Sequence, residues 1–274
     1  MDYLRYLRID KLPHIWCEGC GNGIVLKSLL RVIDELKLDP DKTVIVSGIG
    51  CSSRTPGYMD FNTLHTTHGR AIAYATGIKL AKPELEVIVI TGDGDATAIG
   101  GNHFIHAARR NINITVLIYN NYIYGMTGGQ VSPTTPLFKY TTTTPYGNPE
   151  QPFDISKLAK AAGASFVART TVYHFQKMDT YIKKAILKKG FSVVEIITPC
   201  PTAFGRKNKE DRGIDMLKKQ REIAVPIEKA KSLSSDELKD KIIIGIFQDI
   251  EKEEYTDLYK RIREEIKNNN KVRL

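Results

Sequence analysis

The chain has 274 residues, of which 42% are hydrophobic, and its formal net charge is +9 at pH 7. This length suits one large α/β domain, alone or with an extension, and the apolar content allows a packed core without disulfides. No apolar run of about 18 residues occurs, which excludes a transmembrane helix. The start of the chain lacks the apolar segment of a secretory signal, so we expect a cytoplasmic protein that does not bind membranes.

The positive charge does not by itself indicate a nucleic-acid-binding protein. Lysine and arginine are interspersed with glutamate and aspartate, notably from Arg206 onward, and no DNA- or RNA-recognition motif is present. We therefore expect a solvated basic surface, as on lysine-rich thermophile proteins, or a basic face that docks an acidic electron carrier or coenzyme A. Nucleic-acid binding is the weaker alternative, and it would show as salt-sensitive association.

The first half of the chain predicts alternating helices and strands. After a surface segment over residues 1–15, we expect a helix over 22–36 with Asn22 as its N-cap, a strand over 43–47, a loop over 55–62, a helix over 69–81 that Pro83 ends, a strand over 87–90, a helical segment over 96–108 and a strand over 114–119. Periodicity and turn residues carry these assignments.

The second half continues this alternation after a long loop. We expect a loop over 125–152, a helix over 155–162, a strand over 165–168, a helix over 174–188, a strand over 191–198, an apolar run over 242–247 and a charged terminal helix over 251–268. A loop as long as 125–152 inside a domain is usually functional. The alternation argues for an α/β fold with a doubly wound, mostly parallel sheet.

Two predicted strands end in side chains that carry oxygen. The strand over 87–90 runs into Gly92-Asp93-Gly94-Asp95, and the strand over 114–119 runs into Asn120-Asn121. Open parallel sheets bind ligands outside the carboxyl ends of their strands, and glycines beside Asp93 let the backbone approach an anion. A carboxylate, an amide oxygen and phosphates suit Mg²⁺ better than an all-protein Ca²⁺ cage. A Ca²⁺ loop or an ordinary pair of turns is the alternative, although the pattern of an EF-hand is missing.

This stretch resembles the signature of thiamine-diphosphate enzymes, in which Gly-Asp-Gly is followed, about two to three dozen residues later, by Asn-Asn. The resemblance implies a Mg²⁺ ion bound by the Asp93 carboxylate, the Asn121 side chain and the backbone carbonyl of Ile123. The metal would then hold the diphosphate of thiamine diphosphate.

Four cysteines form a second constellation. Cys17 and Cys20 share one loop, whereas Cys51 and Cys200 each follow a predicted strand, so all four can converge at one sheet edge. A reducing cytosol argues against disulfides, and the C-x-x-C pair indicates a metal or cluster site. Zn²⁺, a 4Fe–4S cluster and buried thiols without metal are all compatible with the spacing. Because Cys51 lies in a turn that should also line the thiamine site, we favour a redox cluster.

Six motifs occur in an order that is similar to a known family. They are WCEGCGNG, GIGCSSR, HTTHGRA, GDGD, NNYIYGMTGGQ and TPCPT. Together they resemble the β subunit of 2-oxoacid:ferredoxin oxidoreductases over residues 16–202, most closely its 2-oxoglutarate (KorB-type) branch. The same machinery acting on pyruvate, a branched-chain oxoacid or an indole-pyruvate is the alternative.

The resemblance implies a division of roles among the residues. Residues 1–202 would form the thiamine-diphosphate-binding domain with the iron–sulfur ligands, and residues 203–274 a C-terminal extension. Cys17, Cys20, Cys51 and Cys200 would hold a 4Fe–4S cluster. The residues expected to line the cofactor and its thiazolium are Ile49, Gly50, Cys51, Ser52, Gly92, Gly94, Asp95, Gly125 and Met126.

Two residues are candidates for direct action on the substrate. Arg54 follows the cofactor turn and could grip the substrate carboxylate with two hydrogen bonds, or it could be an ordinary surface arginine. His68 could contact diphosphate or transfer a proton, or it could be a structural histidine. Asp95 could reach the metal shell or cap the following helix.

The implied reaction is the coenzyme A-dependent oxidative decarboxylation of a 2-oxoacid to an acyl-CoA and CO₂, with electrons passing through the cluster to ferredoxin, and it is reversible as reductive carboxylation. The activating Glu and the pyrimidine-binding half would lie on a partner α subunit, so the β chain alone should be inactive; γ and δ subunits are further candidate partners. From a different class, the chain could be a zinc-stabilised binding module without catalysis.

Overall fold

The structure is a computed structural model that describes residues 3–210 and 212–270. The strands are β1 (Thr43–Ser47), β2 (Asn62–His65), β3 (Glu86–Gly92), β4 (Thr115–Asn120), β5 (Ile123–Tyr124), β6 (Gln130–Val131), β7 (Phe166–Thr171), β8 (Ser192–Ile197), β9 (Ala224–Pro226) and β10 (Ile242–Asp249). The α-helices are α1 (Asn22–Leu36), α2 (Thr55–Tyr58), α3 (Ala71–Ala81), α4 (Gly101–Arg110), α5 (Ile155–Ala161), α6 (Phe175–Leu187), α7 (Gly213–Ile223), α8 (Ile227–Ala230) and α9 (Tyr255–Asn270).

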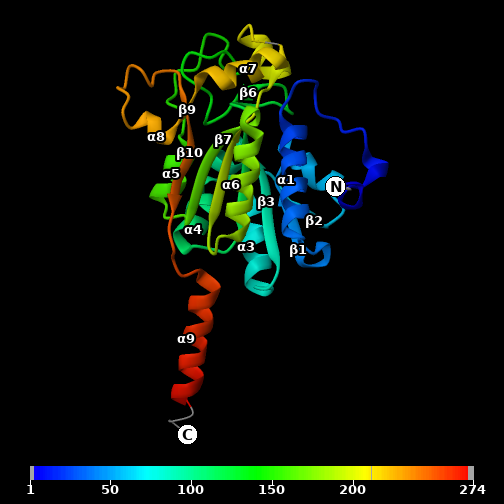
Figure 1. Cartoon of the computed structure of the whole chain (residues 1–274), viewed down its shortest axis with the longest axis vertical. Coiled ribbons are helices and arrows are strands. Elements are labelled where there is room, and N and C mark those ends of the chain that lie inside the picture. The colour runs from blue at the N-terminus through cyan, green and yellow to red at the C-terminus, as the bar shows by residue number, and fades with distance from the viewer. Residues whose placement is uncertain (1–2, 211, 271–274) are drawn as a thin grey trace.

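Eight of these strands form one sheet in the order β2-β1-β3-β4-β8-β7-β10-β9 (Figure 1). All neighbours are parallel except β7 and β10, which pair antiparallel. β5 and β6 make a separate antiparallel hairpin. The predicted α/β fold with a mostly parallel sheet is confirmed.

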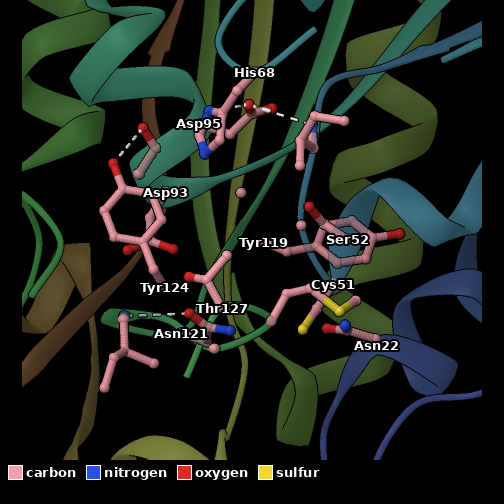
Figure 2. Close-up of a pocket in the computed structure, with 17 residues that line it drawn as sticks. Asn22, Cys51, Ser52, His68, Asp93, Asp95, Tyr119, Asn121, Tyr124 and Thr127 are labelled. Carbon is pink, nitrogen blue, oxygen red and sulfur yellow. Dashed lines mark hydrogen bonds and ion pairs between the residues drawn. The ribbon is translucent and has the colours of Figure 1, made fainter. Parts of the chain in front are cut away.

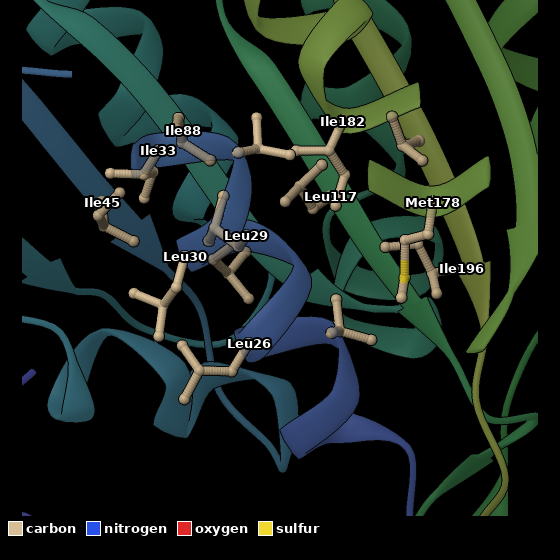
Figure 3. Packing of buried hydrophobic residues seen from close by; sticks show 14 of the residues in the cluster. Leu26, Leu29, Leu30, Ile33, Ile45, Ile88, Leu117, Met178, Ile182 and Ile196 are labelled. Carbon is tan, nitrogen blue, oxygen red and sulfur yellow. The ribbon is translucent and has the colours of Figure 1, made fainter. Parts of the chain in front are cut away.

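Helices cover both faces of the sheet. Ile88 and Ile90 of β3 pack in one apolar cluster with α1 and α6, part of which appears in Figure 3. Val87 and Val89, which alternate with them, pack in a second cluster with α3, α4 and α5. A strand with both faces covered must be apolar at every position, which is why β3 reads as a continuous apolar run.

The chain leaves β1 and β3 toward opposite faces of the sheet. The segment after β1 packs through Tyr58 and Met59 into the cluster of α1 and α6, whereas α4, which follows β3, packs through Phe104 into the other cluster. Loops that diverge in this way open a crevice at the carboxyl ends of the strands, where ligands bind in open parallel sheets.

Two local predictions are corrected. Asn22 is the first residue of α1 rather than its N-cap, which is Gly21. The predicted loop over 55–62 contains α2 and leads into the edge strand β2. β2 was missed because its residues are exposed or half-buried, so no apolar alternation marks it.

The helical segment over 96–108 divides into two parts. A π-helical turn covers Asp95–Ile99, and the regular helix α4 begins only at Gly101. Single π turns of this kind occur often at functional sites, and this one begins at Asp95, the last residue of the Gly-Asp-Gly-Asp sequence.

The N-terminal segment does not simply run over the surface as predicted. Tyr6 is buried and stacks near Phe61 at 5.9 Å, and Leu7 forms a bridge with Met59. Arg5 also donates to Asp34 of α1 at 2.7 Å. Residues 1–2 lie outside the described part of the chain.

The segment after residue 202 contributes to the same sheet, because β10 pairs with β7 and β9 pairs with β10. α9 then leads away from the body of the molecule (Figure 1). A domain boundary at residue 202 stays a prediction. Across residues 3–210 and 212–270, no helix has the length and apolarity needed to cross a membrane.

A glutamate at the start of β3 gives a pH-dependent test of this fold. Burial raises the pKa of Glu86 to about 7, which the charge of Lys79 only partly opposes. The folded state therefore binds this proton more tightly than the unfolded chain, so stability falls as the pH rises from about 4 to 7 and stays lower above it. We expect Glu86→Gln to stabilise the chain by about 1–3 kcal/mol at pH 8 and hardly at pH 4.5. Urea unfolding at both pH values measures this, and equal gains would contradict it.

Candidate active site

A cleft lies between the loops that follow β1, β3, β4 and β5 (Figure 2). The residues that line it are Asn22, Ile49, Gly50, Cys51, Ser52, His68, Gly92, Asp93, Gly94, Asp95, Tyr119, Asn121, Ile123, Tyr124, Gly125, Met126 and Thr127. All of the residues expected to line the cofactor, and the three expected magnesium ligands, are among them. Of the two substrate candidates, His68 lines the cleft and Arg54 does not.

Asp93 lies at the centre of the site and is only 2% exposed. Burial raises the pKa of its carboxyl group, and hydrogen bonds from the hydroxyl groups of Ser132 and Thr134 act in the opposite direction. Both hydroxyls donate to the same oxygen, Thr134 at 2.6 Å. Because these partners are neutral, they leave the carboxylate charge uncompensated. A bound divalent cation would neutralise it, which fits the predicted metal site.

The turn after β4 takes its shape from two successive asparagines. The Asn120 side chain accepts from the backbone N–H of Tyr122 at 3.2 Å, and that of Asn121 accepts from the N–H of Ile123 at 3.2 Å. Tyr122 has a φ of 64°, a left-handed conformation that such side-chain turns support. The two turns bring the Asn121 amide and the start of β5 to the edge of the cleft.

A buried hydrogen-bond network supports this turn from beneath. Glu195 of β8 accepts from Asn120 at 2.9 Å, from Ser156 at 2.7 Å and from Arg169 at 2.7 Å. The amide nitrogen of Asn120 makes the bond to Glu195, and its amide oxygen accepts from the Thr134 hydroxyl at 3.1 Å. A continuous path of contacts therefore runs from the Arg169–Glu195 ion pair to the residue that binds Asp93.

Sequence reasoning missed the members of this network. Ser132 and Thr134 lie in the loop over 125–152, whose length alone indicated function. Glu195 stands in an otherwise apolar strand and is 2% exposed. A charged residue inside a buried strand was the available signal, since such a residue must find partners.

Asp95 organises the loops around the cleft rather than capping a helix. It is 3% exposed, and its carboxylate accepts from the N–H of Gly69 at 2.7 Å, from the Thr91 hydroxyl at 2.7 Å and from the N–H of Ile49 at 3.4 Å. His68 Nδ1 lies 2.8 Å from Asp95 Oδ1. It is nevertheless out of line for a hydrogen bond and has no other partner within the described chain.

Tyr124 closes one side of the cleft. Its hydroxyl donates to the carbonyl of Gly94 at 3.1 Å, and a Cβ at position 94 would lie 2.3 Å from its ring. A side chain at position 94 would therefore displace the Tyr124 ring. Burial raises the pKa of Tyr124 to about 12, so its hydroxyl stays neutral and remains a donor at physiological pH.

The turn after β1 has the features of an anion site. Gly50 has a φ of 118°, and no atom lies within 4 Å of the position a Cβ would take there. The neighbouring Ser52 hydroxyl is buried and, among the described residues, has no hydrogen-bond partner. Buried polar groups without partners are rare and point to a missing ligand. The turn thus fits a phosphate group entering the cleft.

The four cysteines gather as predicted, and none forms a disulfide. A Cβ on Gly125 would lie 3.4 Å from the Cys200 sulfur and 3.7 Å from the Cys51 sulfur. Burial, and then the neighbouring thiols Cys200, Cys20 and Cys17, raise the pKa of Cys51 to about 12. Burial likewise raises the pKa of Cys20 to about 11, with smaller effects from Cys17 and Cys200.

Within residues 3–210 and 212–270, no three His, Cys, Asp or Glu side chains already stand at the spacing of one metal ion. Zinc would require sulfur atoms about 2.3 Å from a common centre, whereas a cubane of four irons holds its ligands farther apart. Trp16 fixes the arrangement by donating to the carbonyl of Cys51 at 2.7 Å. Four thiols gathered at one place are the ligand set of a 4Fe–4S cluster as well as of zinc, and the cluster stays a prediction.

Arg54 lies in the short 3₁₀ turn after Cys51 and is exposed. Its guanidinium lies near Gly57, and its charge contributes to the lowered pKa of His65, second to burial. Any contact of Arg54 with the substrate carboxylate stays a prediction.

The fold and the cleft define a class of protein. Residues 48–196 match the family described as thiamine pyrophosphate enzyme, C-terminal TPP binding domain. This stretch contains β3, β4 and nearly all of β8, and every residue of the cleft except Asn22. The chain therefore carries a thiamine-diphosphate-binding domain.

Comparison with individual proteins shows which family of thiamine-diphosphate enzymes the chain belongs to. The chain is 54% identical to the 2-oxoglutarate synthase subunit KorB of Methanocaldococcus jannaschii, over 96% of this chain and 98% of that protein. It is 53% identical to the KorB subunit of Methanothermobacter marburgensis, over 96% and 92%. The chain belongs to the KorB family of 2-oxoglutarate synthase subunits, which are thiamine-diphosphate-dependent 2-oxoacid:ferredoxin oxidoreductases.

A solved structure agrees with this assignment. The chain is similar to the 2-oxoglutarate:ferredoxin oxidoreductase from Magnetococcus marinus, whose structure has 2-oxoglutarate, coenzyme A and succinyl-CoA bound. The TM-score is 0.86 at 34% identity, and the match covers 99% of this chain and 94% of that one. The match therefore includes the segment after residue 202.

The buried ion pair beneath the site gives a stability prediction. Glu195→Met leaves the Arg169 guanidinium buried beside Asp154 alone, and we expect a loss of about 3–5 kcal/mol in the free energy of unfolding. The double variant Arg169→Met/Glu195→Met removes both charges and should recover much of this loss. Urea unfolding of the three chains measures the difference. A double variant no more stable than Glu195→Met would contradict the assignment of the loss to the broken Arg169–Glu195 ion pair.

Proposed function

We propose that this chain is the catalytic β subunit of an enzyme that converts 2-oxoglutarate and coenzyme A to succinyl-CoA and CO₂ and passes the electrons to ferredoxin. The observation that carries the proposal is the convergence of Asp93, Asn121 and the Ser52 hydroxyl on one cleft that Cys51 also borders. Among the described residues, that hydroxyl has no hydrogen-bond partner. A diphosphate site and a thiol cluster that share one residue suit a reaction in which decarboxylation is coupled to electron transfer.

The Asp93 carboxylate, the Asn121 amide oxygen and the Ile123 carbonyl would hold Mg²⁺. The Ser52 hydroxyl and the backbone of Gly92, Gly94 and Gly50 would accommodate the diphosphate. When bound, thiamine diphosphate supplies a carbanion and an electron sink for decarboxylation. The chain's own part would be to fix the diphosphate end through the network that holds Asn120 and Thr134, while Gly125 and Met126, which also line the cleft, would contact the rest of the cofactor.

The side chains at the open mouth of the cleft support a role for a partner chain. Met126 is 46% exposed and Ile49 is 37% exposed, although both line the cleft. Apolar side chains exposed in this way become buried when another surface covers them. We assign this cover to the α subunit, which would bring the pyrimidine-binding half and the activating Glu; further γ and δ subunits would attach elsewhere.

Cys17, Cys20, Cys51 and Cys200 would hold a 4Fe–4S cluster, which supplies one-electron transfer. Burial raises the pKa of Cys20, Cys51 and Cys200, and iron would displace the protons of these three thiols. The substrate assignment rests on the KorB relatives and on the ligands of the Magnetococcus marinus structure. His68, whose Nδ1 has no hydrogen-bond partner within the described chain, is the candidate for a proton at the cleft, and Arg54 for the substrate carboxylate. The reverse direction, reductive carboxylation, uses the same residues.

The metal assignment predicts a specific defect. Asp93→Asn keeps the size of the side chain but removes the charge, so we expect a loss of at least about 100-fold in the affinity of the assembled α–β complex for Mg²⁺ and thiamine diphosphate. Calorimetric titration with magnesium and cofactor measures the affinity. Asp10→Asn, an exposed aspartate in the N-terminal segment, is the matched control and should bind normally. Normal binding by Asp93→Asn would remove Asp93 from the metal site.

The assembled complex tests the reaction and the cluster together. We expect four irons per β chain, a brown colour, and viologen reduction that requires coenzyme A and is faster with 2-oxoglutarate than with pyruvate. The β chain alone should show no turnover, because it lacks the activating Glu. A clear preference for pyruvate would overturn the substrate, whereas a colourless protein with one zinc per chain would favour a non-catalytic binding module.

A further inference from the structure

One exposed surface beside the cysteines carries a concentration of positive charge. Between Arg206 and Lys219 the sequence has six basic and three acidic residues. We define the basic patch as Arg206, Lys207, Lys209, Arg212 and Lys218, all of which are exposed. The half-buried Glu210 contributes little negative charge to the surface, since it is bonded to both Lys139 and Lys219.

The basic patch is attached directly to the cysteine cluster. The segment begins at Cys200, whose carbonyl accepts from the N–H of Gly205 at 2.8 Å. Farther along, Gly213 packs backbone to backbone against Gly19, which lies between Cys17 and Cys20. A Cβ on Gly19 would lie 2.8 Å from the Gly213 Cα. The patch is thus held against cysteines from two separate loops, and Cys17 itself is exposed.

A second loop makes the patch rigid and adds apolar surface. The Asn208 side chain accepts from the N–H of Tyr140 and donates to its carbonyl, both at 3.0 Å. A hollow on this surface is lined by Lys207, Lys209, Phe138 and Tyr140, among others. Phe138 is 76% exposed and Tyr140 is 48% exposed. Exposed aromatic rings among lysines form the apolar centre and charged rim of a small protein interface.

We propose that the basic patch, with Phe138 and Tyr140, is the surface on which the acidic electron-carrier protein docks to exchange electrons with the cysteine-bound cluster. This inference rests on the proposed function, because it requires a cluster at the four cysteines. Electron-transfer contacts are small and short-lived, so a compact patch suffices. Positive charge gathered beside the cluster raises the rate at which an acidic partner arrives in the right orientation.

The test compares a protein electron acceptor with a small dye. In the assembled complex, Lys207→Glu/Lys209→Glu should lower kcat/KM for an acidic ferredoxin by about 10-fold or more at low salt, and the difference should shrink as salt is added. Reduction of benzyl viologen, which needs no docking surface, should stay within about two-fold of the unmodified complex. Direct binding of ferredoxin, measured by surface plasmon resonance, should weaken in parallel.

The control is Arg109→Glu/Arg110→Glu, which makes the same change in net charge at the end of α4. These exposed arginines end α4 and lead to the amino end of β4, whereas the cysteines lie at the carboxyl ends of the strands. Ferredoxin kinetics should therefore hardly change. Equal effects of the two variants would show a general charge effect and overturn the proposal. So would unchanged ferredoxin kinetics in the lysine variant, or failure of that variant to assemble with the α subunit. Absence of dye reduction in the unmodified complex would instead refute the proposed function.

Discussion

The site depends on one electrostatic constraint, the burial of the Asp93 carboxylate among neutral hydroxyl groups. A buried carboxylate without a cation is costly, and hydrogen bonds from Ser132 and Thr134 offset only part of the cost. The chain tolerates this arrangement because the loop that supplies the hydroxyls is itself held from below by Asn120. A cation in the cleft would neutralise the carboxylate and remove the rest of this free-energy cost. The ends of β3 and β4 are therefore suited to bind a metal ion.

The support beneath the site extends into the C-terminal segment. Arg169, which pairs with Glu195, lies with its guanidinium 5.0 Å from the ring of Phe247, a residue of β10. Arginine stacks well on aromatic faces. The Phe247 ring therefore covers the Arg169 charge on the side of β7 where β10 pairs. The antiparallel strand β10 therefore serves the site as well as the sheet, because it encloses the ion pair that holds Asn120 in place.

The cleft and the cysteine cluster share the turn after β1. This turn would therefore connect the proposed cofactor site with the proposed electron-transfer site. Ser52 lines the cleft, while the sulfur atoms of its neighbour Cys51 and of Cys200 both lie near Gly125. In the proposed reaction, electrons released at the cleft would have a short route to the cysteines. On the far side of the cysteines, the segment after Cys200 carries the basic patch. In the proposed reaction, electrons would pass from the cleft to the cysteines and then to the carrier at the basic patch.

The sequence by itself determined the sheet, the Gly-Asp-Gly-Asp and Asn-Asn strand ends and the convergence of the four cysteines. These features are set by local patterns: buried parallel strands are apolar throughout, and parallel strands end at one edge. Only the tertiary structure decided that Ser132 and Thr134 bind Asp93, that Glu195 holds Asn120, and that Gly213 lies against Gly19. Each of these contacts joins residues far apart in the chain, through loops and side chains whose positions follow from packing rather than from any local periodicity.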